Sequence, residues 1–280
     1  MVSSVHVVTD STADIPSHLV AELDITVLPC IIAFGNEVYC DGVDLSNAEF
    51  YDKLADSPVL PTTAHPPLGV FLETYERLCR GGDAVFSIHI SRQLSGTMRT
   101  ATMAASALPD LPIRVMDSGQ LSMGLGWQAI IAARAAQRGL SLDEICEQAA
   151  EITGRARAAA ALRSLWHVQR GGRIGKAAAL LGTALRMRPL VQVLHGEVLP
   201  LENVRTWRKA LEHLAGYIIA AGPSAELAVL HAANPESGEV LADLLADYFP
   251  RERILMGEAG ATITTHLGLG AVGICAVLAS

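Results

Sequence analysis

The chain has 280 residues, half of them hydrophobic, and a formal net charge of −8. This length allows one large or two ordinary domains, and an acidic chain without a basic run argues against nucleic acid as the main partner. No run of about 18 uncharged apolar residues occurs, so we expect a soluble protein without a transmembrane segment, which leaves room only for transient membrane contact.

Cysteine spacing and the start of the chain limit the class of protein further. The cysteines are odd in number and have no C-x-x-C spacing, which predicts neither a disulfide framework nor a zinc site: Cys30, Cys40, Cys79, Cys146 and Cys275. We expect no metal and no other cofactor. The first residues enter a strand-like segment without a leader pattern, so we expect a cytoplasmic protein.

The first half of the chain alternates between strand-like and helix-like segments. We expect strands at 5–9, 25–34 (broken at Pro29), 84–90 and 113–116, helices near 17–23, 46–54, 68–80 and 141–153, and strand–helix units over 84–106 and 113–138. Ser46 with Glu49, and Ser141 with Glu144, have the spacing of capping boxes. The proline-rich stretch 58–67 is predicted to be a loop. This alternation indicates a mostly parallel sheet covered on both faces.

The second half has a different order of elements. We expect a strand at 156–162, a helix near 174–185, a hairpin over 189–201, a helix capped by Thr206, a helix over 235–248, and strands at 227–231, 253–256 and 272–278. The stretch 260–273 is predicted to be a glycine-rich loop. The fold class is therefore α/β, with an N-terminal domain over 1–155 and a mixed-sheet C-terminal domain over 156–280.

Three strand-like segments lead directly into loops rich in hydroxyl residues. These loops are Asp10-Ser11-Thr12, the stretch 91–97 with Ser95-Gly96, and the stretch 117–122 with Ser118. Loops at the carboxyl ends of parallel strands, where helices begin, commonly bind small anions. None has the glycine spacing of a nucleotide loop, so the sequence predicts an anion that is not evidently a nucleotide.

Other segments could contribute polar groups to such a site. Prolines flank Thr62-Thr63 and stiffen the loop that carries them. His266 lies among threonines in the 260–273 stretch. The basic stretch 170–176, with Arg173, lacks the strand and spacing of a phosphate loop, so we discount ATP binding and consider an acidic partner instead.

Several of these stretches together resemble the DegV family of bacterial fatty-acid-binding proteins. The matching segments follow in order along essentially the whole chain: 9–16 (TDSTADIP), 62–66 (TTAHP), 90–97 (ISRQLSGT), 117–126, 170–182, 196–198, 204–206, 231–235 and 265–268. Two positions differ from the family pattern. Ala64-His65 replaces Ser-Gln, and Leu269 stands where the family usually has proline.

The resemblance implies two α/β domains with a long-chain fatty acid, such as palmitate, buried between them. It implies that Thr63 and Ser95 hold the carboxylate, that His266 lies near the head group, and that Thr62, Gly96 and Ser118 are neighbours. Some relatives are binding subunits of a fatty-acid kinase, in which the arginine that matches Arg173 contacts the kinase. The resemblance therefore implies a non-catalytic binding protein with a role in lipid transport or fatty-acid metabolism.

Two alternatives stay open. The chain could be an enzyme that acts on a small anionic or phosphorylated metabolite at the same loops, and Ser95 with His266 is then the nucleophile–base pair. It could instead be a regulatory or scaffold protein for which the ligand is only a signal.

Overall fold

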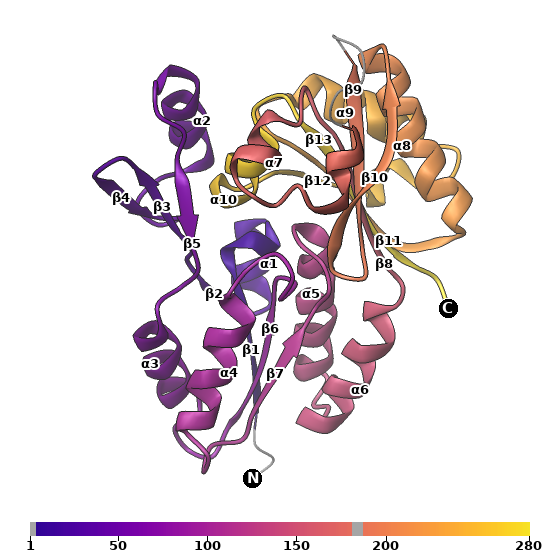
Figure 1. The fold of residues 1–280 in the computed structure, drawn as a ribbon. Helices are drawn as coiled ribbons and strands as arrows, with labels where there is room; N and C mark the ends of the chain where they lie inside the picture. Colours follow the sequence, from indigo (N-terminus) through magenta and orange to yellow (C-terminus); the bar gives the residue numbers. More distant parts are fainter. Residues whose placement is uncertain (1–3, 181–186) are drawn as a thin grey trace.

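The computed structural model describes residues 4–180 and 187–280, and the strands of these residues form three sheets (Figure 1). The first is a four-stranded parallel sheet with the order β2 (Thr26–Leu28), β1 (Val5–Asp10), β6 (Ala84–His89) and β7 (Ile113–Asp117). Strand β6 is buried along its whole length, as expected for a central strand of a covered parallel sheet. The carboxyl ends of β1, β6 and β7 meet at one edge, where the three hydroxyl-rich loops begin.

The second half of the chain forms a six-stranded mixed sheet. Its order is β10 (Glu197–Val204), β9 (Arg188–Leu194), β8 (Ala156–Ala161), β13 (Val272–Leu278), β11 (Ser224–His231) and β12 (Leu255–Glu258). Only β11 and β12 pair in parallel, and the other neighbours are antiparallel. The α/β class, with a parallel sheet followed by a mixed sheet, is confirmed.

The helices cover these sheets and begin where the sequence places their caps. Ser46 and Ser141 form complete capping boxes, and Thr206 accepts a hydrogen bond from a backbone N–H of the helix that it starts. The α-helices are α1 (Ser17–Glu22), α2 (Asn47–Asp56), α3 (Leu68–Leu78), α4 (Thr97–Ala107), α5 (Met123–Gln137), α6 (Leu142–Thr153), α7 (Trp166–Arg170), α8 (Trp207–Ala221), α9 (Pro235–Leu244) and α10 (Ala261–Leu267). Short 3₁₀ helices are η1 (Ser11–Ala13), η2 (Gly175–Leu180) and η3 (Arg251–Arg253).

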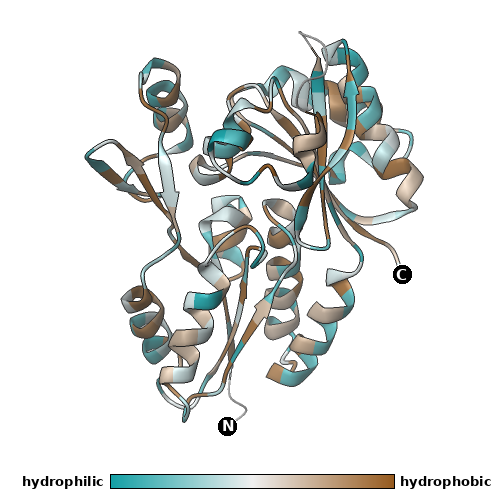
Figure 2. Cartoon of the chain, in the orientation of Figure 1, coloured by the Kyte–Doolittle hydropathy of each residue, from teal (hydrophilic) through white to brown (hydrophobic). Residues whose placement is uncertain are grey.

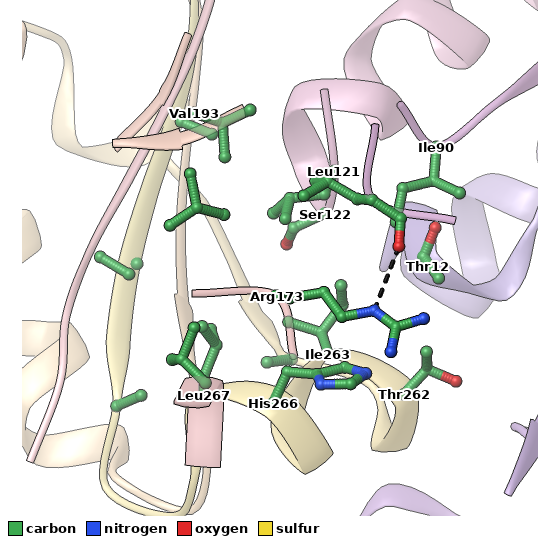
Figure 3. Close-up of a pocket in the computed structure, with 18 of the residues that line it drawn as sticks. Thr12, Ile90, Leu121, Ser122, Arg173, Val193, Thr262, Ile263, His266 and Leu267 are labelled. Carbon is green, nitrogen blue, oxygen red and sulfur yellow. Dashed lines mark hydrogen bonds between the residues drawn. The ribbon is translucent and has the colours of Figure 1, made fainter. Parts of the chain in front are cut away.

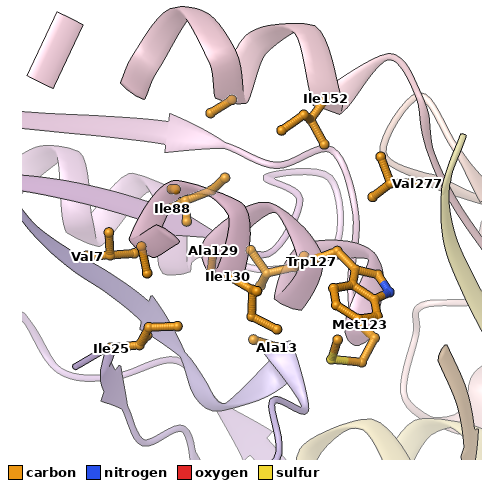
Figure 4. Close-up of a cluster of buried hydrophobic side chains, with 14 of the residues drawn as sticks. Val7, Ala13, Ile25, Ile88, Met123, Trp127, Ala129, Ile130, Ile152 and Val277 are labelled. Atoms are coloured by element: carbon orange, nitrogen blue, oxygen red, sulfur yellow. The ribbon is translucent and has the colours of Figure 1, made fainter. Parts of the chain in front are cut away.

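Helix α5 lies between the parallel sheet and the mixed sheet and contacts strands of both. It is buried on almost every side, as expected of a helix without a polar face. Figure 4 shows its Trp127 and Ile130 among side chains from both halves of the chain, including Val7 and Val277. A Cβ at Gly126 would lie 2.6 Å from the Ala13 carbonyl oxygen, so close approach of the chain requires glycine there.

A third, antiparallel sheet corrects two expectations about the first half. Its strands are β4 (Glu37–Cys40), β3 (Ile31–Phe34) and β5 (Thr62–Ala64). The expected broken strand at 25–34 is two strands in different sheets, because the chain leaves β2 at Pro29-Cys30. The proline-rich loop contains β5, which pairs with β3 even though prolines flank it. Only tertiary pairing stabilises so short a strand.

Two further expectations about the second half are wrong. The expected loop at 260–273 contains α10, because its run from Ala261 to Leu267 packs against α2, α7 and β5. The expected helix over 174–185 is a 3₁₀ turn from Gly175 to Leu180, and its remaining residues lie outside the described part of the chain. Figure 2 shows hydrophobic colours along the strands within the molecule and mixed colours on outer helices such as α8.

Candidate functional site

A cavity of about 310 Å³ lies where the carboxyl edge of the parallel sheet faces the mixed sheet. Its wall is mostly apolar, with Ala158, Ala159 and Ala160 from β8, Val191 and Val193 from β9, and Leu230 from β11. Figure 3 shows residues of α10, β9 and the β7–α5 loop around this space. The volume is at the lower end of the usual range for small-molecule sites.

The polar groups of two predicted loops lie on the wall of this one cavity. Thr63 comes from β5, and Ser95 with Gly96 comes from the loop before α4. The imidazole of His65 joins the two segments, because a Cβ at Gly96 would lie only 2.8 Å from its Cδ2 atom. Segments 32 residues apart in the sequence are thus in direct contact at the mouth of an apolar cavity.

His266 lies on the last turn of α10 and also lines the cavity. Its Nε2 atom is 3.0 Å from the Thr63 hydroxyl oxygen. Burial, with the nearby charges of Arg173 and His167, lowers the pKa of His266 to about 4, so the ring is neutral at neutral pH. Among the described residues its buried Nδ1 atom has no hydrogen-bond partner.

Either ring nitrogen of His266 can carry the proton, and the direction of the contact with Thr63 depends on which one does. With the proton on Nε2, His266 donates to the Thr63 oxygen, and the Thr63 hydroxyl keeps its own proton for a ligand. In that form the pair presents one aimed O–H donor to the cavity.

Ser95 is held in place by the start of α4. Its hydroxyl oxygen lies 2.8 Å from the Thr97 hydroxyl oxygen and accepts a hydrogen bond from the Thr97 backbone N–H. When the buried Thr97 hydroxyl donates to Ser95, the Ser95 proton is free for a ligand. Ser95 is thus a second donor from a separate loop.

Three other hydroxyls on the cavity wall are hydrogen-bonded to buried aspartates behind them. Ser122 donates to Asp14 over 2.6 Å, and Thr262 donates to Asp41 over 2.6 Å. Thr12 donates to Asp10 in the same way. Thr12 and Thr262 therefore have no proton left for a carboxylate ligand. Burial raises the pKa of Asp14 to about 8, so Asp14 holds a proton of its own at neutral pH and does not commit Ser122 in the same way. Thr63 and Ser95 are the hydroxyls of the described wall that have no acidic partner.

Arg173 lies between this cavity and a second, more open cavity of about 780 Å³. Its guanidinium donates to the Leu94 carbonyl over 3.2 Å and to the Gly171 carbonyl over 2.7 Å. It is the one permanently charged side chain on the described wall of the inner cavity. The outer cavity also carries basic side chains on its wall: Arg92, Arg99 and Lys176.

Not every predicted site residue reaches the inner cavity. The described wall includes neither Thr62, which is exposed on β5, nor Ser118, which is buried and donates to the Gln120 carbonyl. The enzyme alternative requires Ser95 to pair with His266. In the described residues His266 bonds to Thr63, and Ser95 bonds to Thr97.

The sequence pattern did not predict a buried series of hydrogen bonds that joins a serine, a histidine and an aspartate. His89 lies between the Ser87 hydroxyl at 2.7 Å and the Asp10 carboxylate at 2.9 Å, and Tyr75 donates to Ser87. All four side chains are fully buried or nearly so. A substrate could not reach Ser87, so this series of hydrogen bonds ties β1 to β6 and fixes Asp10 behind Thr12.

The described helices include none that is long and apolar enough to cross a membrane. Within 4–180 and 187–280, no group of three or more histidine, cysteine and acidic side chains is placed to hold a metal ion. Cys30 and Cys275 line the inner cavity, and both are buried. Burial raises the pKa of the Cys275 thiol to about 12, so this thiol is protonated at neutral pH.

The described residues thus form an apolar cavity with one hydrogen-bonding end, an arrangement that is typical of sites for small ligands. Residues 4–279 match the model of the DegV family, which is described as an uncharacterised protein family. The chain belongs to the DegV family. A DegV domain-containing protein of Streptomyces coelicolor is 38% identical over 275 residues, which is 96% of this chain and 97% of that protein.

Solved structures of the family have the same fold. A DegV family protein from Thermus thermophilus, described as binding fatty acid, has a TM-score of 0.91 and 29% identity, and the match covers 99% of this chain and 100% of that chain. DegV of Bacillus subtilis, described as a fatty acid binding protein, has a TM-score of 0.87 and 32% identity with the same coverage.

Proposed function

We propose that this chain binds a long-chain fatty acid, such as palmitate, with its carboxylate between Thr63 and Ser95 and its tail in the apolar cavity. The observation that carries the proposal is the distribution of donors. Two hydroxyls without an acidic partner lie at one end, and the other wall hydroxyls bond to buried aspartates. Relatives described as fatty acid binding proteins support the same ligand class.

The energetics of the cavity agree with this ligand. Each buried methylene group contributes about 0.8 kcal/mol, so a C16 tail gains on the order of 11 kcal/mol before ordering costs. The carboxylate loses its water and needs several donors and a nearby cation in return. Thr63, Ser95 and Arg173 provide these groups. We also propose that the ligand lies between two domains, 1–155 and 156–280, since the cavity wall takes residues from both.

The test is extraction of the purified protein followed by mass spectrometry, and titration of the delipidated protein with palmitate. We expect a copurifying fatty acid and saturable binding in the nanomolar to micromolar range. Absence of extracted acid together with absence of palmitate binding would refute the proposal. Turnover of a phosphorylated metabolite by the isolated chain, lost in Ser95→Ala, would favour the enzyme alternative instead.

We further propose that the chain presents its bound acid to a fatty-acid kinase through the outer cavity. Arg173 borders both cavities, and the described outer wall also carries Arg92, Arg99 and Lys176 against one acidic side chain, Glu197, which pairs with Lys176. An anionic phosphoryl group at the ligand's head would therefore meet positive charge. Arg173→Ala is expected to reduce phosphorylation of bound acid by a cognate kinase far more than Arg138→Ala, at the end of α5, does. Equal rates in both variants would contradict this role.

A further inference from the structure

His65 has an unused nitrogen at the mouth of the inner cavity. It follows β5 directly and lines the cavity together with Thr63, two residues before it. Its Nδ1 atom lies 3.0 Å from the Pro66 carbonyl oxygen and 3.4 Å from the Thr100 hydroxyl oxygen. A carbonyl oxygen can only accept, so Nδ1 carries the proton and Nε2 carries the lone pair.

The position of Nε2 places it beside the proposed head-group site. A Cβ built at Gly96 would lie 3.1 Å from Nε2, so this edge of the ring rests against the residue that follows Ser95. In the described residues Nε2 has no hydrogen-bond partner. A carboxylate next to this lone pair would be repelled unless a proton is shared between them.

We propose that His65 is a further ligand of the fatty-acid carboxylate and that one proton from solvent enters with the acid, held between Nε2 and a carboxylate oxygen. This inference rests on the proposed function. The balance is simple: neutral His65, a carboxylate and one proton give an imidazolium that donates to the carboxylate. No covalent bond forms or breaks in the ligand.

The other titratable groups on the described wall leave His65 as the source of proton coupling between pH 7 and 9 at the wall itself. On the wall, His266 and His231 have lowered pKa values, the thiols of Cys30 and Cys275 have strongly raised ones, and Arg173 stays charged. From α4, Arg99 lies near Gly96 and also stays charged. The described wall carries no acidic side chain. Behind the wall, burial raises the pKa of Asp14, the partner of Ser122, to about 8, so the His65→Gln variant below separates its proton from one held at His65.

The experiment is calorimetric titration with dodecanoate at pH 8, in two buffers that differ in ionisation enthalpy. We expect the wild-type protein to take up about one proton per ligand and its affinity to fall about tenfold per pH unit toward pH 9. His65→Gln keeps a neutral donor and should lose both the proton uptake and the pH slope. His18→Gln, on the exposed face of α1, is the matched control and should behave as wild type.

A second variant separates ligation from mere packing. His65→Leu should weaken dodecanoate about tenfold or more at pH 7 while dodecanol binding changes little, because only the acid uses the shared proton. Equal loss for both ligands would show that His65 only shapes the mouth and would overturn the inference. Wild-type binding without proton uptake would overturn it as well, whereas failure of wild type to bind dodecanoate and palmitate would instead refute the proposed function.

Discussion

Replacement of Gly171 by alanine tests whether the position of the His266 ring determines how tightly the proposed carboxylate ligand binds. Gly171 ends α7 with an ordinary helical φ of −73°, so alanine causes no backbone strain there. Its Cβ, however, would lie 2.2 Å from the His266 Nδ1 atom and 2.8 Å from Cε1. Ordinary contact needs about 3.5 Å, so the ring has to move by about 1.3 Å.

The ring cannot move straight toward Thr63, because that oxygen is already at 3.0 Å. It has to rotate, and its hydrogen bond with Thr63 is lost. Loss of a buried hydrogen bond with an unsatisfied partner costs about 1–3 kcal/mol, which corresponds to roughly a tenfold to hundredfold weaker affinity for palmitate.

The assay is displacement of a fluorescent fatty acid, with thermal unfolding measured on the same samples. Gly216→Ala, within α8 and with no atom within 4 Å of the new Cβ, is the control for an added methyl group. Gly172→Ala introduces strain at φ +72° without a clash. Wild-type affinity in Gly171→Ala would refute this reasoning, and so would an equal loss in Gly172→Ala.

Three further outcomes follow from the site. Thr63→Val and Ser95→Ala should each weaken palmitate binding by about 1–3 kcal/mol without changing the melting temperature, and unaltered calorimetric affinity in both would contradict their role. Burial raises the pKa of Asp14 to about 8, so the native carboxyl keeps a proton that the unfolded chain releases above about pH 4. Stability should therefore fall as pH rises from 4 to 8, by up to about 1.4 kcal/mol per unit, and Asp14→Asn should flatten this slope in urea unfolding. Burial lowers the pKa of His266 to about 4 in the native protein, so as pH falls the unfolded chain binds the proton first. The free energy of unfolding should therefore decrease as pH drops from 6.5 to 4. A His266→Gln variant that loses as much stability over this range would contradict the prediction.

Local patterns in the sequence predicted much of the scaffold correctly. The capping boxes at Ser46 and Ser141 depend on residues three apart, and such short-range hydrogen bonds form whatever the tertiary surroundings are. The parallel order of strands and helices likewise predicted that loops after β1, β6 and β7 share one edge. Because Ser95 and Ser122 lie in loops at that edge, both residues reach the wall of the same cavity.

Long-range packing decided the elements that were missed. Strand β5 exists because β3 pairs with it, and α10 exists as a helix within a glycine-rich stretch because it packs against α2, α7 and β5. Neither contact has a signal in the local sequence. The placement of Ser118 failed for a related reason, since its hydroxyl turns to a carbonyl two residues away rather than to the cavity.

The sequence by itself determined the α/β class and the family, and it marked Thr63, Ser95 and His266 as candidate polar groups. Only the tertiary structure decided which hydroxyls have an acidic partner. That depends on Asp10, Asp14 and Asp41, which are distant in sequence from most of the hydroxyls they bind. A hydroxyl has one proton to donate, and its direction is set by neighbours that only the folded chain brings within 3 Å.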